Sequence, residues 1–209
     1  YNPEFQIPLN PWNTGRWSGA SSSGSGVATA AGLCFGSLGS DTGGSIRFPA
    51  AACGTVGIKP TWGRVSRNGL RPGMWSMDTV GPISRTVEDC ALTLQAIAGH
   101  DPLDAYTWDV PVPDYRAALD ANLAGKRIGI VTELMNADGI DPEVQSAVSQ
   151  AANTLAELGA RVEETSIPLT NHANTISSVL RVEAPTNYRD LIRNRLREIN
   201  HDNRIAYLT

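Results

Sequence analysis

Lysine, aromatic residues and positive charge are scarce in this sequence. Only Lys59 and Lys126 occur among its 209 residues, and 6% of the residues are aromatic. Lys and Arg together number 17 against 21 for Asp and Glu, which gives a formal net charge of -4. Proteins that bind nucleic acid place Lys and Arg against phosphates, so this balance argues against a nucleic-acid partner. Hydrophobic residues at 41% and charged residues at 18% are typical of a folded globular protein.

The sequence also lacks a long apolar run. Residues 17–40 carry no charge, but serines and glycines interrupt this stretch throughout. A membrane-spanning helix needs about 20 predominantly apolar residues, so no membrane partner is expected. The chain does not open on a basic segment followed by an apolar one, so we expect no signal peptide and a cytoplasmic location. It begins with Tyr1 rather than Met, which suggests processing or truncation.

Cysteine and histidine are few and poorly placed for metal binding. The three cysteines are Cys34, Cys53 and Cys90, an odd number without a CxxC pair, so neither a zinc site nor a disulfide framework is predicted. They are expected to be small buried residues in a reducing compartment. No two of the three histidines have the spacing of metal ligands. We therefore expect no metal or other cofactor.

Several catalytic motifs are absent as well. The sequence contains no GxSxG nucleophile elbow and no GxxxxGK[ST] phosphate loop. It has no SxxK either, because the residues three positions before the two lysines are Val56 and Leu123. The mechanisms that depend on these motifs lose their support.

Glycine is concentrated near the start of the chain. Residues 1–81 hold 15 of the 20 glycines and only three acids, Glu4, Asp41 and Asp78. A flexible linker could have this composition, but a linker has no reason to hold apolar residues such as Leu33, Ile46 and Ile58. The pattern favours a functional site built largely from backbone.

The first half predicts short elements around two serine clusters. Small residues at 22–31 favour a helix started by the serine cluster, whose hydroxyls cap free N–H groups. Residues 35–39 predict a short buried strand, and DTGGSIRFPAAACG from Asp41 predicts a tight turn leading into a short helix limited by Pro49. A further helix is expected at 85–98, capped by Thr86 and ended by Gly99.

The second half predicts a βαβ unit at 126–168. Three prolines and four aspartates at 101–114 indicate a surface connection and a boundary between subregions. Strands are expected at 127–132 and 160–167, around a helix that begins at Asp141-Pro142 with one apolar face and ends at Gly159. This order favours a partly parallel sheet in an α/β fold. Residues 186–200 predict a half-exposed helix.

Two serine loops lie 24 residues apart, one at 21–23 and one at Ser45, each next to glycine. A nucleophilic serine needs a base that takes its proton and backbone donors that hold the oxyanion. The TGGS turn offers closely spaced N–H groups. Gly-Gly-Ser turns are also common as purely structural features, so both interpretations stay open on chemistry alone.

Three segments resemble one family. They are GASSSGSGVATAAG from Gly19, GSDTGGSIRFPAAACGTVGIKPTWGRVSRNGL from Gly39 and DTVGPISRTVEDCAL from Asp78. Over about residues 9–100 the sequence resembles the amidase signature family. The resemblance implies a mixed, partly parallel sheet covered by helices. It further implies that residues 1–209 form one partial domain, incomplete at both ends, whose signature core is 9–100.

The resemblance implies a Ser-cisSer-Lys hydrolase. Ser45 would be the nucleophile, and Ser21, reached through a cis peptide, would bridge it to the base. The oxyanion hole would consist of the backbone N–H groups of Thr42, Gly43, Gly44 and Ser45. Supporting roles would fall to Ser22, hydrogen-bonded to Ser21, to the pair Asp41 and Arg47, and to a structural Lys59. The family's lysine lies upstream of the first serine loop, where this chain has none.

Three functions follow as hypotheses. The first is an amidase that converts a carboxylic amide to an acid and ammonia or an amine, with a small amide as its partner and a homo-oligomer as one possible state. The second is the glutaminase-type subunit of an amidotransferase with partner subunits. The third is a catalytically silent fragment without the lysine. Trp62, Met74, Trp75 and Met77 either line an acyl pocket or belong to the core.

Overall fold

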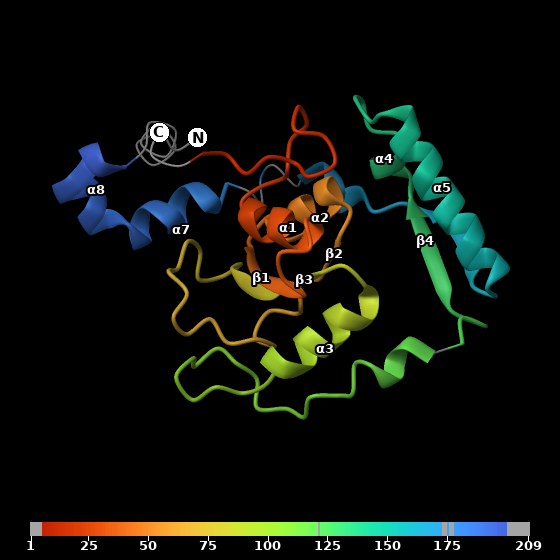
Figure 1. Ribbon diagram of the computed structural model, residues 1–209, viewed down its shortest axis with the longest axis horizontal. Coiled ribbons are helices and arrows are strands. Elements are labelled where there is room, and N and C mark those ends of the chain that lie inside the picture. Colours follow the sequence, from red (N-terminus) through yellow and green to blue (C-terminus); the bar gives the residue numbers. More distant parts are fainter. Residues whose placement is uncertain (1–5, 121, 173–174, 176–177, 200–209) are drawn as a thin grey trace. The chain divides into compact units, whose positions relative to one another are not determined.

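The structure, a computed structural model, describes residues 6–120, 122–172, 175 and 178–199 (Figure 1). The chain divides into two units, Tyr1–Leu119 with Val179–Thr209, and Asp120–Ser178. The first unit contains both serine loops. The expected boundary within 101–114 was wrong, because Ser66 donates to Asp101 and Thr107 is buried, which fastens that connection to the first unit.

The first unit is built on an antiparallel sheet in the order β1-β3-β2. β1 (Gly36–Asp41) pairs with β3 (Thr79–Ser84) from Gly36↔Ser84 to Asp41↔Thr79, and β2 (Val56–Gly57) pairs with the other edge of β3. The strand expected at 35–39 exists, but the prediction that it is buried was wrong. Phe35, which lies just before β1, is 88% exposed, and Leu38 of this edge strand is 48% exposed.

Helices cover both faces of this sheet. Figure 1 shows α1 (Ser23–Ala30) and α2 (Arg47–Cys53) on one side and α3 (Val87–Ile97) on the other. The glycines of β1 agree with this view. A Cβ at Gly39 would lie 2.7 Å from the hydroxyl of Ser22 before α1, and one at Gly36 would lie 3.6 Å from that of Thr93 in α3. Side chains alternate between the two faces along a strand, and Gly36 and Gly39 are an odd number of positions apart. The two glycines therefore face different helices.

Helix starts follow local chemistry only in part. Thr86 caps α3 as predicted, accepting from the backbone N–H of Asp89 at 3.0 Å. Ser22 precedes α1 but does not cap it, so the predicted serine cap was wrong. Its hydroxyl instead donates to the carbonyl of Ser40 and accepts from the N–H of the same residue, each at 3.2 Å. The side chain therefore connects α1 to β1.

The segment before the first serine loop is fastened to the end of α2. Asn10 is buried, and its amide nitrogen donates to the carbonyls of Trp17 at 3.0 Å and Ala52 at 2.8 Å. The indole of Trp12 donates to the carbonyl of Cys53 at 2.7 Å. These bonds hold the chain that leads into residues 19–21 against the helix that follows Ser45.

The second unit has the predicted βαβ order. β4 (Arg127–Val131) and β5 (Arg161–Thr165) pair in parallel, with α5 (Pro142–Glu157) between them in sequence. Asp141 caps α5 by accepting from the N–H of Glu143 at 2.9 Å. A short helix α4 (Thr132–Met135) follows β4 directly. The predicted apolar face of α5 is mostly exposed, with Val144 at 53% and Val148 at 43%.

The remaining elements are short. They are η1 (Ala117–Asp120), η2 (Pro168–His172), α7 (Leu180–Asn187), α8 (Arg189–Arg195) and η3 (Leu196–Glu198). The single helix expected at 186–200 was wrong, since the chain breaks into separate pieces at Tyr188, and Asn200 lies outside the described residues. Among the helices that the structure describes, none has the length and apolar content needed to cross a membrane.

Candidate active site

The TGGS turn is organised around the carboxylate of Asp41. This residue ends β1 and is fully buried. Its Oδ1 accepts from the backbone N–H of Gly44 at 2.7 Å, and its Oδ2 accepts from that of Ile46 at 3.1 Å. Arg47 completes the arrangement as expected, donating from Nε to Oδ2 and from Nη2 to Oδ1, both at 3.0 Å. One side chain thus ties the strand, the turn and the start of α2 together.

The charge on Asp41 is stabilised by these donors. Burial on its own raises the pKa of this carboxyl, but the hydrogen bonds from Arg47, Gly44 and Ile46 outweigh it and lower the pKa to about 2. The same pairing raises the pKa of Arg47. Both groups are therefore ionised at neutral pH, and the turn is held by a charged, bidentate pair.

Three of the four backbone donors of the turn are unpaired. In the described part of the chain the N–H groups of Thr42, Gly43 and Ser45 have no acceptor, whereas that of Gly44 is bonded to Asp41. The prediction that Gly44 supplies an oxyanion donor was therefore wrong, because its hydrogen is already engaged. Thr42 and Ser45 are half-buried and Gly43 is exposed, so none of the three lies in the buried core. Closely spaced, unpaired N–H groups of this kind suit a developing oxyanion.

Gly44 has a clear steric reason to be glycine. Its φ of +126° lies in a region that residues with a side chain rarely adopt. A Cβ at this position would lie 2.3 Å from the ring of Phe48. Glycine therefore lets the turn pack closely against Phe48 of α2.

The first serine loop meets this turn directly. The peptide bond between Ala20 and Ser21 is cis, as the resemblance implied. The N–H of Ser22 donates to the carbonyl of Ser45 at 3.1 Å. Ser21 is exposed, next to that contact in sequence. Two loops that are 24 residues apart in the chain are thus joined by a backbone hydrogen bond.

Other predicted supports behave differently. Ser22 was expected to hydrogen-bond Ser21, but its hydroxyl is engaged with Ser40 of β1, so that expectation was wrong. No hydrogen bond or ion pair connects Lys59 or Lys126 to either serine loop within the described residues. A group of three or more His, Cys, Asp or Glu side chains able to hold a metal ion is also absent from that part of the chain.

Asp78 is a polar residue of this region that sequence reasoning did not select. It is buried, and its Oδ1 accepts from the hydroxyl of Thr42 at 2.5 Å. The other oxygen accepts from the backbone N–H groups of Gly73 at 2.8 Å and Met74 at 2.7 Å. The available signal was its rarity, since it is one of only three acids in the first 81 residues.

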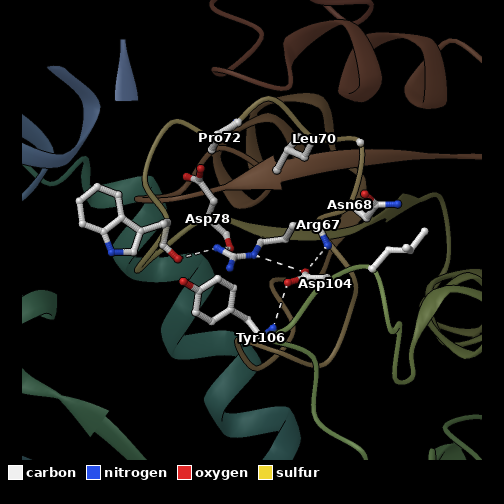
Figure 2. Close-up of a pocket in the computed structure, with 10 residues that line it drawn as sticks. Arg67, Asn68, Leu70, Pro72, Asp78, Asp104 and Tyr106 are labelled. Atoms are coloured by element: carbon white, nitrogen blue, oxygen red, sulfur yellow. Dashed lines mark hydrogen bonds and ion pairs between the residues drawn. The ribbon is translucent and has the colours of Figure 1, made fainter. Parts of the chain in front are cut away.

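A cavity of about 280 Å³ lies beside Asp78 (Figure 2). Its lining residues are Arg67, Asn68, Gly69, Leu70, Pro72, Trp75, Asp78, Leu103, Asp104 and Tyr106. Of the four residues considered for an acyl pocket, Trp75 lines this cavity, Met74 is buried in the core and Met77 is half-buried. Trp62 packs on Tyr106 with ring centroids 5.3 Å apart. A second cavity of about 570 Å³ borders Ser22 and Ser40.

Comparison with known proteins identifies the family of this chain. The family model described as Amidase matches residues 1–207. The chain belongs to this family, the amidase signature family, and its fold is the mixed α/β fold of that family.

Individual members of the family are similar to this chain in sequence and in structure. The chain is 54% identical over 172 residues to the A subunit of glutamyl-tRNA(Gln) amidotransferase from Moorella thermoacetica, a match that covers 82% of this chain and 35% of the relative. The structure of the corresponding protein from Thermotoga maritima matches with a TM-score of 0.79 and 36% identity, over 94% of this chain and 42% of that one. A bacterial aryl acylamidase matches with a TM-score of 0.80 and 30% identity, over 96% and 43%. The chain thus spans about a third of the length of the curated relatives it matches.

Proposed function

We propose that this chain carries the nucleophile of an amidase that hydrolyses a carboxylic amide through an acyl-enzyme on Ser45. One observation carries the proposal. Ser45 lies on a turn with three unpaired N–H groups, and the same turn is hydrogen-bonded to the loop of Ser21. Family membership supports the reaction class, since the matching structures include a peptide amidase and an aryl acylamidase.

The chemistry proceeds in two halves. The hydroxyl oxygen of Ser45 attacks the amide carbon while its proton passes to Ser21, and the oxyanion is held by the N–H groups of Thr42, Gly43 and Ser45. The C–N bond then breaks, and the departing nitrogen takes a proton back through Ser21. Water hydrolyses the ester on Ser45 by the same route, which releases the acid and restores the hydroxyl.

A base must accept the proton that Ser21 relays. In this proposal it is an uncharged lysine, as the family resemblance implies, on a segment that precedes the first serine loop in the parent protein. Its pKa would have to be lowered by burial so that it can accept a proton at neutral pH. Proton transfer of this kind contributes about 10²- to 10⁴-fold to a rate.

The test uses the full reading frame that encodes this chain. Release of ammonia or amine is measured for glutamine, asparagine, aliphatic amides and anilides, and a fluorophosphonate probe is located by mass spectrometry. Labelling of Ser45 and loss of all turnover in Ser45→Ala are expected. Ser25→Ala is the matched control, because this hydroxyl is nearby but donates to the carbonyl of Leu38. If Ser45 stays unlabelled while turnover is intact, Ser45 is not the nucleophile. If the protein is both unlabelled and inactive, the result favours the hypothesis that it is catalytically silent.

A second candidate is the amidase component of an amidotransferase. It is favoured by 54% identity to the A subunit of glutamyl-tRNA(Gln) amidotransferase. In this case glutamine is the amide, and its ammonia passes to partner subunits instead of solution. Stable association with such subunits, with glutaminase activity that rises when they are present, distinguishes this function from a free amidase.

A further inference from the structure

The carboxylate of Asp78 lies between the TGGS turn and the loop at 67–78. Its Oδ1 holds the hydroxyl of Thr42 at 2.5 Å, whereas its Oδ2 is anchored by the backbone N–H groups of Gly73 and Met74. Asp78 is only 4% exposed, so solvent cannot easily replace these bonds. The Asp78 side chain therefore links the loop at 67–78 to Thr42, the first residue of the TGGS turn.

The loop that carries Asp78 is itself fixed. Arg67 donates from its guanidinium to the carbonyl of Trp75 at 2.6 Å, and its backbone N–H donates to Asp104 at 2.7 Å. The guanidinium carbon lies 5.1 Å from the ring centroid of Tyr106 (Figure 2). In addition, the amide of Asn187 in α7 donates to the carbonyl of Gly73 at 2.8 Å. The loop that carries Asp78 is therefore held in place by several hydrogen bonds.

Thr42 offers the turn two different groups. Its hydroxyl is taken by Asp78, and its N–H is one of the three unpaired donors in the described part of the turn. The residue before it, Asp41, is held in β1 and by Arg47. With Thr42 held on both sides, the peptide that carries its N–H has little freedom to rotate. Donors fixed before the reaction cost no reorganisation when negative charge develops.

We propose that Asp78 is a positioning residue for amide hydrolysis, which directs the Thr42 N–H toward the oxyanion by holding the Thr42 hydroxyl. The proposal rests on the proposed role of Ser45. Asp78 does not touch the reacting atoms in this scheme and moves no proton. Its contribution is made through Thr42 and is realised only when the oxyanion forms.

Thr42→Val is the decisive variant, expressed in the full reading frame. It removes the hydroxyl while keeping the N–H, the branched shape and the anchoring of Asp78 to Gly73 and Met74. We expect kcat to fall roughly 10- to 100-fold with KM little changed, because the lost restraint acts on the transition state. Thr42→Ser retains the hydroxyl and should restore most of the rate. Asp78→Ala also removes the acceptor for the N–H groups of Gly73 and Met74 and can fail to fold.

Inhibitor binding separates positioning from a general structural effect. An aldehyde analogue of the substrate forms a tetrahedral adduct on Ser45, so its affinity should fall by the same factor in Thr42→Val. Affinity for the carboxylic acid product should stay within about twofold. An equal loss for both ligands, or no rescue by Thr42→Ser, would overturn the role of Asp78. If Thr42→Val keeps the wild-type kcat and Ser45→Ala is inactive, only the positioning role of Asp78 is overturned. If Ser45→Ala is active, the proposed function is overturned as well.

Discussion

Two arginine–carboxylate pairs in this chain differ in their surroundings. On the surface of the parallel ladder, Arg127 donates to Glu163 at 2.5 Å, with both partners accessible to solvent. Near Ser45, Asp41 is inaccessible and takes the N–H of Gly44 in addition to the guanidinium of Arg47. Solvent screens the first pair and it adds little, whereas loss of a buried carboxylate leaves backbone donors without partners. The same type of ion pair therefore contributes little on the surface of the parallel ladder, whereas near Ser45 it holds the turn together.

The comparison extends to whole regions. In the serine-loop region, residues 19–47, key hydrogen bonds join residues far apart in the chain, such as Thr42 with Asp78. In the βαβ unit, residues 126–168, the longest helix, α5, is started by the local cap of Asp141. Matched substitutions in the two regions should therefore have unequal effects, and the following predictions test that difference.

The largest difference is expected between two serines. Ser21→Ala should lower kcat by several powers of ten, because it interrupts the proposed proton relay from Ser45. Ser149→Ala in α5 removes a hydroxyl that only donates to the carbonyl of Gln145, and should leave kcat unchanged. Steady-state amide hydrolysis by the two variants decides the matter. Near-normal turnover in Ser21→Ala would refute the relay.

Two glycines with positive φ should differ in stability. Gly44→Ala should cost about 2–4 kcal/mol, because its Cβ would collide with Phe48 and its φ is +126°. Gly139→Ala has a φ of +84° and open space around the new Cβ, so strain alone should cost about 1 kcal/mol. Urea unfolding midpoints measure both. Equal costs would show that the turn over α2 can relax.

Neutralising a carboxylate should matter only in the serine-loop region. Asp41→Asn should destabilise the protein by about 3 kcal/mol at pH 7, whereas Glu163→Gln should cause no measurable change. The pKa of Asp41 is lowered from 3.8 to about 2 by its hydrogen bonds, so its stabilisation is complete above pH 4 and disappears as pH falls toward 2. Unfolding curves at several pH values should show the gap between wild type and Asp41→Asn closing over that interval. A gap that persists at pH 2 would contradict the charged state as its cause.

Helix caps should show the smallest effect, and the same one in both units. Thr86→Ala and Asp141→Ala each remove an acceptor for the first free N–H groups of a helix and should cost about 1 kcal/mol. The shift of the urea midpoint measures each cost. A loss several times larger in either variant would mean that the cap residue has a further role.

Local pattern was sufficient for some of the regular elements. The strand at 127–131, the cap at Asp141 and the cap at Thr86 could be predicted because each depends on neighbours within a few residues. The exposure of Phe35 and the broken helix at Tyr188 could not, since burial and continuity depend on which segments lie alongside. Ser22 shows the same limit. Serine is a common helix cap, but the hydroxyl of Ser22 is hydrogen-bonded to the backbone of Ser40 in β1 instead.

Residue order was enough to reveal the two serine clusters and the resemblance to the family, and that resemblance implied the pairing of Asp41 with Arg47, because motifs of this kind are carried by residue types close together in the chain. Three further features became visible in the fold alone: the N–H of Gly44 is already used, the loops of Ser21 and Ser45 are hydrogen-bonded, and Asp78 holds Thr42. Those contacts arise from the approach of backbone segments distant in the chain. Residue order alone does not say which donor and acceptor will face each other once the sheet and helices have packed.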